Sequence, residues 1–336
     1  MRAVVYTETG PSSVLRVVER DAPEPGPGEV RVRVVTAGVN PTDWKFRAVM
    51  GPTHPEVAPG QDGAGVVDAV GEGVDHLAVG DRVWLYLAQH EKGIGAAAEL
   101  TVQAADRVVP LPDGASFDLG ASLGVPALTA HRALTSGDVP RLAPGTLAGT
   151  TVLVAGGAGA VGNAAIQLAV WSGATVVTTV SSPAKAALAR AAGAHHVVDY
   201  RTEDVVAAVR AIAPDGVDLV VEVAPATNIG IDLAVVRNHG TVAYYANDGG
   251  DEVTLPVRQA FAKNLRLQGV FLYQVAPVLL RAGAEDVTAA VAAGALRVGE
   301  DAGLPLHHFR LEELAAAHDA VEDRTVGKVL VQVTTA

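Results

Sequence analysis

One glycine-rich segment constrains the fold of this chain more than any other feature. An apolar run, Thr151–Ala155, leads into the sequence GGAGAVG, and a helical stretch over Asn163–Trp171 follows. Glycines at positions 157, 159 and 162 give the spacing G-x-G-x-x-G. A strand that turns tightly into a helix lets backbone N–H groups at the helix start approach a pyrophosphate. We therefore expect a dinucleotide to bind along Gly156, Gly159, Ala160, Val161 and Gly162.

Apolar strands alternate with Ala-rich helical stretches from Ala121 onward. Strands are predicted at Thr151–Ala155, Ala174–Val180, His196–Val198, Val217–Val223, Gly240–Ala246 and Leu265–Phe271. A second helix is predicted at Pro183–Ala192, and later segments at Val275–Gly294 (helix) and Lys328–Val333 (strand). This alternation is typical of an α/β fold with a doubly wound, six-stranded parallel sheet of the Rossmann type, which we place at residues 123–273.

The first 120 residues have a different pattern. Short β-branched runs at Arg2–Tyr6, Val30–Val35 and Gly65–Val70 are separated by Gly and Pro, as in the loop segment PEPGPGE at positions 23–29. Several short strands at close spacing predict a small barrel or sandwich. With 336 residues in all, the chain is long enough for about two domains of this kind.

Charge and cysteine content exclude several classes of function. The formal net charge is −12, which opposes the basic patch that nucleic-acid binding requires. The sequence contains no cysteine, so disulfides, thiolate nucleophiles and thiolate-bound metals are excluded. The N-terminal segment MRAVVYTETG lacks the apolar core of a signal peptide, and no apolar stretch is long enough to span a bilayer. We expect a cytoplasmic protein without a membrane partner.

The end of the second strand indicates which dinucleotide binds. NAD-selective folds place Asp or Glu there to hold the ribose hydroxyls, whereas this chain continues with Ser181, Ser182, Pro183, Ala184 and Lys185. Hydroxyls and an ammonium favour a 2′-phosphate, and Tyr200 after the third strand can reach the same pocket. The alternative is a serine-capped helix start with a solvated lysine. Since capping and phosphate binding are compatible, the sequence favours NADPH.

The ordered set of motifs resembles the zeta-crystallin-like quinone oxidoreductases, within the medium-chain dehydrogenase/reductase superfamily. Besides the glycine loop, the resemblance is carried by GVNPTD at 38–43, PGQDGAGVV at 59–67, GDRV at 80–83, VPALTA at 125–130 and GKVLV at 327–331. It implies a GroES-like, β-rich catalytic domain at residues 1–122 and 274–336. It also implies that NADPH lies in the cleft between the domains, and that the chain forms a homodimer through the edge of the nucleotide-binding sheet.

The resemblance also implies a metal-free member of that superfamily. Zinc alcohol dehydrogenases hold zinc with a Cys, a His-Glu pair and a further ligand, and the corresponding positions here are Asn40, Gln61 and Asp62. Glutamine is a poor zinc ligand, and the cysteine-rich structural-zinc lobe is missing. We therefore expect no metal site.

The same resemblance supplies candidate residues for the chemistry. Asn40 and Thr129 are implied to lie beside the nicotinamide, although Asn40 also suits a purely structural place before Pro41. Lys45 stands where the family often has Tyr, so it is a candidate substrate residue or a loop ion-pair partner of Asp43. Further cofactor contacts are expected at the strand ends and on the C-terminal tail, from Val223, Ala224, Tyr244, Tyr245, Phe271, Leu272, Tyr273 and Lys328.

These residues suit hydride transfer from NADPH to an electron-poor acceptor. A quinone accepts hydride readily and takes its proton from water, so no strong protein acid is required. An enoyl or alkenal reductase, acting on an α,β-unsaturated carbonyl or thioester, would use the same geometry. The third alternative is an NADPH-binding structural or regulatory protein without turnover.

Overall fold

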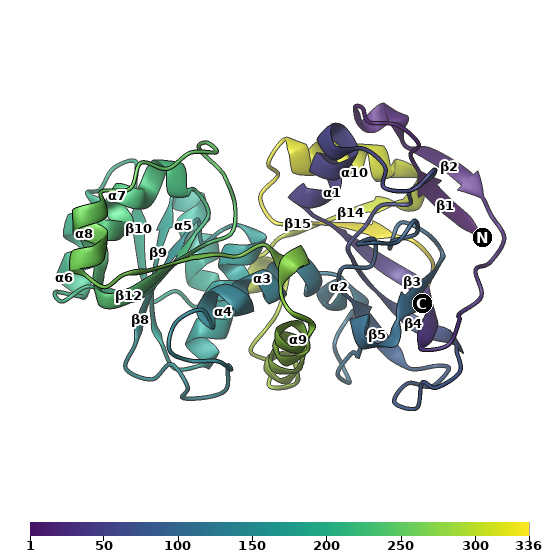
Figure 1. Ribbon diagram of the computed structural model, residues 1–336, viewed down its shortest axis with the longest axis horizontal. Coiled ribbons are helices and arrows are strands. Elements are labelled where there is room, and N and C mark those ends of the chain that lie inside the picture. Colours follow the sequence, from purple (N-terminus) through teal and green to yellow (C-terminus); the bar gives the residue numbers. More distant parts are fainter. Residues whose placement is uncertain (336) are drawn as a thin grey trace. The chain divides into compact units, whose positions relative to one another are not determined.

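The computed structural model describes residues 1–335, which form two compact units (Figure 1). The first unit contains residues 1–125 together with the described residues from Pro305 onward, and the second contains Pro126–Leu304. Residues 274–304, predicted to belong to the GroES-like domain, lie in the second unit. The reason is packing, since Asp286 on helix α9 (Pro277–Ala292) binds His131 on helix α3 (Gly124–Leu134) of that unit.

The first unit is built around a seven-stranded sheet of order β14-β15-β3-β4-β5-β7, with β6 paired to β3 and a separate β1–β2 hairpin. Its strands are β1 (Arg2–Val5), β2 (Arg16–Glu19), β3 (Glu29–Val39), β4 (Asp62–Val70), β5 (Arg82–Leu85), β6 (Leu100–Ala104), β7 (Val108–Pro110), β14 (Leu306–Arg310) and β15 (Lys328–Gln332). Its helices are α1 (Pro41–Lys45), α2 (Phe117–Gly120) and α10 (Leu314–Glu322), with short helical turns at Ser12–Val14, Phe46–Met50, Ala105–Arg107 and Leu311–Glu313.

The core of the first unit follows from alternation along its long strand β3. Val30, Val32 and Val34 are completely buried, and they pack with β-branched residues of the neighbouring strands and with α10. The chain's last strand, β15, pairs antiparallel with β3, so that Val329 lies opposite Val39. This pairing places Lys328 beside Asn40, which directly follows β3.

The second unit is the predicted doubly wound α/β domain. Its parallel sheet has the order β10-β9-β8-β11-β12-β13, and the crossover between β8 and β11 marks the point where the strand order reverses. The strands are β8 (Thr151–Ala155), β9 (Thr175–Val180), β10 (His196–Asp199), β11 (Val217–Glu222), β12 (Val236–Tyr244) and β13 (Arg266–Gly269). The six-strand prediction is confirmed.

Helices cover both faces of this sheet, with α4 and α5 on one side of the strands and α6 on the other (Figure 1). Besides α3 and α9, the unit contains α4 (Ala160–Trp171), α5 (Pro183–Ala191), α6 (Val205–Ile212), α7 (Pro225–Val235) and α8 (Val257–Ala262), with short turns at Leu272–Gln274 and Glu300–Ala302. Val205 and Val209 of α6 pack with the central strands in one buried apolar cluster. Both faces being covered explains why these strands read as nearly continuous apolar runs.

Strand limits depart from the predicted ones mainly at the edge of the sheet. β12 begins at Val236, earlier than predicted, because Val236 pairs with Val217 before a register shift in the ladder. β13 ends at Gly269, so Phe271, Leu272 and Tyr273 follow the strand instead of belonging to it. The sequence alone did not indicate the bulge that lengthens β12.

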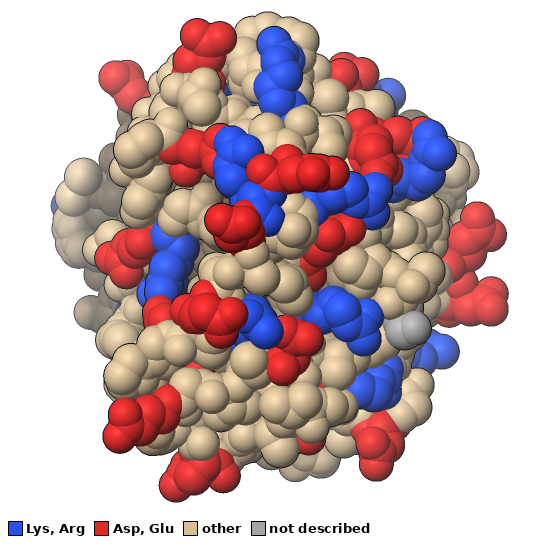
Figure 2. All heavy atoms as spheres, turned by 90° about the vertical axis from the view of Figure 1, so that its right-hand side faces the viewer, with Lys and Arg blue, Asp and Glu red and all other residues tan. Residues whose placement is uncertain are grey.

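Two surface features bear on the choice of partner. On the face shown in Figure 2, acidic and basic side chains are intermixed. Ion pairs of the first unit include Arg20–Glu56 and Arg31–Asp68. An intermixed face of this kind does not offer the continuous positive field that attracts a phosphate backbone. Among residues 1–335, no helix combines the length and the apolar character needed to cross a bilayer.

Candidate functional site

The glycine loop between β8 and α4 has the geometry of an anion cradle. Gly156 has a φ of +71°, a conformation that glycine adopts without strain. A Cβ added at Gly157 would lie 2.1 Å from Thr178 Oγ1, and one at Gly162 would lie 2.4 Å from Gly156 O. Small residues are therefore required for the close packing of loop, strand and helix.

The N-terminus of α4 has no side-chain cap. Gly159 is its N-cap and contributes no side-chain hydrogen bond, so the N–H groups of the first turn are not capped by their own chain. Because the positive end of the helix dipole points the same way, the position suits a pyrophosphate. Gly156, Gly159, Ala160, Val161 and Gly162 are thus assembled at one strand end, as predicted for the cofactor residues.

A second group of predicted residues lies at the carboxyl ends of β9 and β10. Ser182 caps α5, and its Oγ accepts a hydrogen bond from the backbone N–H of Lys185 at 3.3 Å. The Lys185 ammonium donates to Ser181 Oγ at 3.2 Å. The Tyr200 side chain is 53% exposed and follows the strand that pairs with β9. The structure therefore shows the predicted serine cap and a lysine held beside Ser181, and the binding of a 2′-phosphate here stays a prediction.

Glu222 ends β11 and supports the neighbouring loop. Its carboxylate accepts hydrogen bonds from the backbone N–H of Ala224 and from Asn228 Nδ2. Burial, together with the negative charge of the adjacent Glu222, raises the pKa of Asp232 to about 9. Burial also raises the pKa of Glu222. This pair holds the loop that contains Val223 and Ala224, two of the predicted cofactor residues.

The remaining predicted aromatic contacts differ in exposure. Tyr244 is the last residue of β12 and is 39% exposed, whereas Tyr245 is half-buried and donates its backbone N–H to Glu222 O. Phe271 is exposed, and its ring centre lies 5.1 Å from that of Tyr273. Leu272 and Tyr273 are buried. Tyr244 and Phe271 are therefore the members of this group whose side chains are open to a ligand.

In the first unit, Asn40 belongs to a buried polar cluster that we call the Asn40 network, formed by Asn40, Asp43, Asp62 and Lys328. All four residues are at most 2% exposed. Lys328 Nζ donates to Asn40 Oδ1 at 2.8 Å and to Asp62 Oδ2 at 3.3 Å. Asn40 Nδ2 donates to the same Asp62 oxygen at 2.8 Å. The other Asp62 oxygen accepts the backbone N–H of Val125 at 2.7 Å.

Asp43 occupies the structural side of this network. Its two oxygens accept the backbone N–H groups of Asn40 at 2.7 Å and of Gln61 at 3.2 Å, which fixes the start of α1 against β4. Burial raises the pKa of Asp43 to about 7, and the negative charge of Asp62 acts in the same direction. Burial also raises the pKa of Asp62, against the stabilising charge of Lys328.

Lys45 and Thr129, the other predicted catalytic residues, lie in different units. Lys45 ends α1, and its ammonium lies 5.9 Å from the centre of the Trp44 ring, within the range of a cation–π contact. Thr129 lies on α3 and is 5% exposed. The predicted meeting of Asn40, Lys45 and Thr129 at the nicotinamide remains a prediction.

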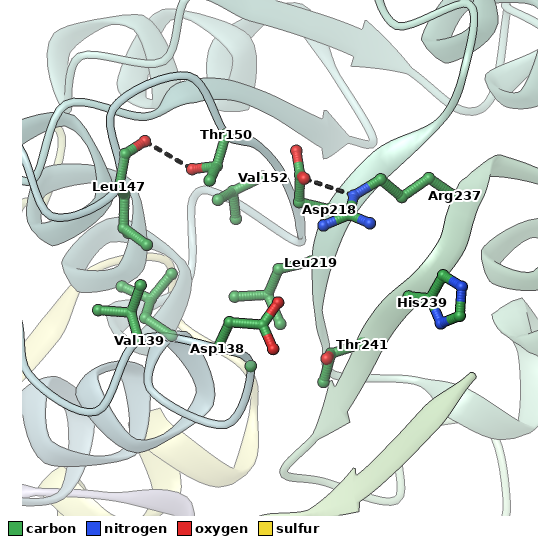
Figure 3. Close-up of a pocket in the computed structure, with 12 residues that line it drawn as sticks. Asp138, Val139, Leu147, Thr150, Val152, Asp218, Leu219, Arg237, His239 and Thr241 are labelled. Carbon is green, nitrogen blue, oxygen red and sulfur yellow. Dashed lines mark hydrogen bonds and ion pairs between the residues drawn. The ribbon is translucent and has the colours of Figure 1, made fainter. Parts of the chain in front are cut away.

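A surface pocket of about 60 Å³ lies at the opposite end of the strands from the glycine loop, in the second unit (Figure 3). It is lined at the amino ends of β8, β11 and β12, where Asp218 pairs with Arg237. Cofactors of doubly wound folds bind at the carboxyl ends of the strands. The pocket has room for a few water molecules only, and it is separate from the candidate site.

Two contributions to the site were not predicted from the sequence. Thr178 and Thr179 of β9 support the glycine loop, since Thr178 Oγ1 donates to Val154 O at 2.7 Å and Thr179 O accepts the N–H of Gly157 at 3.2 Å. Two adjacent threonines inside an apolar strand were the available signal. The linkage of Lys328 to Asn40 spans 288 positions and had no local signal.

Comparisons with known proteins agree with this geometry. The "Zinc-binding dehydrogenase" family profile matches residues 160–293, and the "Alcohol dehydrogenase GroES-like domain" profile matches residues 26–113. The quinone oxidoreductase of Rattus norvegicus is 30% identical, over 96% of this chain and 94% of its own length.

Two solved structures are also similar to this chain over nearly its full length. A mycobacterial protein solved in complex with NADPH superposes with a TM-score of 0.82 at 31% identity, covering 99% of this chain and 100% of its own. The Escherichia coli quinone oxidoreductase complexed with NADPH gives a TM-score of 0.81 at 25% identity, with the same coverage of 99% and 100%.

The zinc in the name of the matching profile does not fit the residues present. Asn40 and Asp62, at the positions of the expected metal ligands, both accept hydrogen bonds from the Lys328 ammonium, which would repel a cation. Gln61 donates its amide to Gln89 Oε1 at 2.7 Å. Among residues 1–335 there is no cluster of three or more His, Asp or Glu arranged to hold a metal ion. The chain belongs to the zeta-crystallin-like quinone oxidoreductases of the medium-chain dehydrogenase/reductase superfamily.

Proposed function

We propose that the chain is an NADPH-dependent oxidoreductase that reduces a quinone or a related electron-poor acceptor without a metal. NADPH supplies a hydride, which adds two electrons and one hydrogen to the quinone, and water supplies the proton that completes the hydroquinone. The chain contributes binding, orientation and electrostatics. Asn40, Lys45 and Thr129 are the proposed residues beside the reacting groups.

The observation that carries the choice of cofactor is the chemistry at the end of β9. Lys185 is held there by Ser181, and the turn from β9 into α5 contains no carboxylate. A 2′-phosphate needs donors and a positive charge, whereas an acidic residue would repel it. Tyr200 lies on the neighbouring strand end, so Ser181, Ser182, Lys185 and Tyr200 are the proposed phosphate residues.

The acceptor is tested by comparing turnover across chemical classes. A panel of quinones, alkenals, enones and enoyl thioesters is offered to the purified protein with NADPH, and loss of the nicotinamide absorbance is followed. Oxidation with quinones supports the proposal. Oxidation confined to enones or enoyl thioesters supports the enoyl or alkenal reductase alternative. Tight NADPH binding without turnover across the panel supports a structural or regulatory protein.

We also propose that the chain is a homodimer joined through the edge of the second unit's sheet. β13 is the outermost strand, so one of its edges has no neighbour in the sheet of the described chain. Exposed apolar side chains surround this edge, namely Val257 and Phe261 of α8, Leu267 of β13 and the following Phe271. Free strand edges flanked by apolar residues favour pairing with another chain, here a second copy.

The proposed compartment is the cytoplasm. A chain without cysteine gains nothing from an oxidising environment, because it cannot form a disulfide. Cell fractionation with an antibody to the native protein tests this assignment. Recovery of the protein in an extracellular or membrane fraction would contradict it.

A further inference from the structure

We propose that Lys328 and Asp62 are positioning residues, which orient the side-chain amide of Asn40 so that it offers an N–H group to the oxygen of the acceptor. This inference rests on the proposed function, in which Asn40 lies beside the acceptor. It assigns a catalytic hydrogen-bond donor, and it gives a role to the buried Lys328–Asp62 ion pair.

The orientation of the amide follows from the chemistry of its neighbours. A lysine ammonium only donates hydrogen bonds, so the Asn40 atom 2.8 Å from Lys328 Nζ must be the carbonyl oxygen. The groups that contact Asp62 are Lys328, the Asn40 amide and the backbone N–H of Val125, which are all donors. The carboxylate form of Asp62 therefore satisfies each contact, and it requires nitrogen on the Asn40 side.

These contacts close a ring that selects one of the two amide hydrogens. Lys328 Nζ bonds to Asn40 Oδ1 and to Asp62 Oδ2, and Asn40 Nδ2 bonds to the same Asp62 oxygen. The N–H group inside the ring is the one on the same side as the amide oxygen. The second N–H group, on the opposite side from the oxygen, takes no part in these contacts, and it is the one that we assign to the acceptor. A flipped amide would instead place its NH₂ against the ammonium.

Backbone contacts hold both Asn40 and Lys328 in place. Asn40 is held by its own N–H, which donates to Asp43 Oδ2, and by β3, which precedes it. Lys328 is held because β15 pairs with β3 and because its backbone N–H donates to Pro305 O at 2.8 Å. A Cβ added at Gly38 would lie 2.0 Å from Ala121 O and 2.9 Å from Lys328 Cε, so the glycine is required first by the nearby backbone and also leaves room for the Lys328 side chain.

The N–H group has a defined role in hydride transfer. As hydride reaches a quinone or enone, negative charge develops on the acceptor oxygen. A donor that is already oriented stabilises this charge without reorganisation, as in an oxyanion hole. A carbonyl oxygen in the same place would repel it. The charge of Lys328 is balanced locally by Asp62, so its main effect is on the orientation of the amide.

A double-mutant cycle tests whether Lys328 acts through Asn40. Asn40→Ala should lower kcat with a quinone roughly 100-fold, the scale of losing one oxyanion donor. Lys328→Met should lower kcat about 10- to 100-fold while leaving the Kd for NADPH within about threefold. In the Asn40→Ala background, Lys328→Met should change kcat less than about threefold, because the amide that it orients is gone. Lys92→Met is the matched control, since that ammonium pairs with Glu29 instead.

A second variant covers the case in which Lys328→Met does not fold. Asp62→Asn is isosteric, and Val125 N–H keeps the amide oxygen of the new side chain on its own side. Its NH₂ group then faces Asn40 Nδ2 and Lys328 Nζ, so the ring loses its acceptor and no longer selects one orientation of the Asn40 amide. We expect a loss of kcat similar to that of Lys328→Met. The free energy of unfolding of the wild type, the two single variants and the double variant gives a readout that does not depend on turnover. The effects of Lys328→Met and Asn40→Ala on this free energy should not be additive.

The outcomes separate this inference from the proposed function. If the wild type oxidises NADPH with quinones and the Lys328 and Asn40 effects multiply independently, the positioning role is wrong. If Lys328→Met weakens NADPH as much as it lowers kcat, Lys328 is a cofactor contact and the inference also fails. If the wild type does not turn over any quinone, the proposed function fails. If, in addition, the effects of Asn40→Ala and Lys328→Met on the unfolding free energy simply add, the interaction between Asn40 and Lys328 is also refuted.

Discussion

Removal of the Lys185 ammonium provides a quantitative test of the cofactor assignment. Lys185 Nζ lies 3.2 Å from Ser181 Oγ at the end of β9, so the ammonium is already held at the proposed phosphate position. A hydrogen bond to a charged group contributes about 1.5–3 kcal/mol. Since about 1.4 kcal/mol corresponds to a tenfold change in affinity, Lys185→Ala should weaken NADPH about 10- to 100-fold.

The assay compares two cofactors on three proteins at one ionic strength. Dissociation constants for NADPH and NADH are measured by titration for the wild type, Lys185→Ala and the control Arg190→Ala. Arg190 lies in the last turn of the same helix and is exposed, so its loss should change neither constant. NADH lacks the 2′-phosphate, and its affinity for Lys185→Ala should stay close to that for the wild type. Equal weakening of both cofactors would show that Lys185 supports the fold and not the phosphate.

Further predictions follow from the glycine loop, the buried carboxyl group, the strand end and the sheet edge. Gly157→Ala should destabilise the protein by about 1–3 kcal/mol in denaturant unfolding, because its Cβ would meet Thr178 Oγ1. The control Gly230→Ala, in α7 with open space around it, should stabilise by about 0.5–1 kcal/mol, and equal effects would contradict the packing argument. Burial raises the pKa of Asp43 from 3.8, the value expected in the unfolded chain, to about 7 in the folded protein. The stability that this shift contributes is therefore complete below about pH 3.8 and is lost as the pH rises through about 7. The unfolding free energy of the wild type should therefore fall relative to that of Asp43→Asn across this interval, by about 1.4 kcal/mol per pKa unit, and parallel pH curves would refute the assignment. Ser181→Asp should shift preference from NADPH toward NADH, because a carboxylate repels the phosphate and suits the ribose hydroxyls; an unchanged ratio would exclude this residue from the pocket. Light scattering should give a dimer for the wild type and a monomer for Phe261→Arg. The control Val79→Arg, at an exposed apolar residue of the first unit, should remain a dimer, and a monomeric wild type would contradict the sheet-edge interface.

The second unit could be predicted from the sequence because its signals are local. Each strand is a short apolar run, and the glycine loop stands directly between β8 and α4. The order of strands follows from the doubly wound pattern. The limits of β12 could not be predicted, because they depend on the register shift between Val217 and Leu219 in the neighbouring strand.

The first unit's site was less accessible to sequence reasoning. Asn40 was selected through its motif, and Lys328 through the tail motif that contains it, but nothing local joins the two. Their contact depends on β15 returning to pair with β3, so that Val329 lies opposite Val39. Long-range register of this kind is a property of the whole sheet. The role of Asp62 was hidden for the same reason, because it lies on a third strand, β4.

The central claim is that the chain transfers hydride from NADPH to an electron-poor acceptor. The most direct test is quinone-dependent oxidation of NADPH deuterated at one or the other C4 position, followed in a single turnover. The account predicts oxidation with a primary kinetic isotope effect for one of the two labelled forms only, because the bound nicotinamide presents a single face. Absence of oxidation with quinones, enones and enoyl thioesters, in protein that binds NADPH, would contradict it.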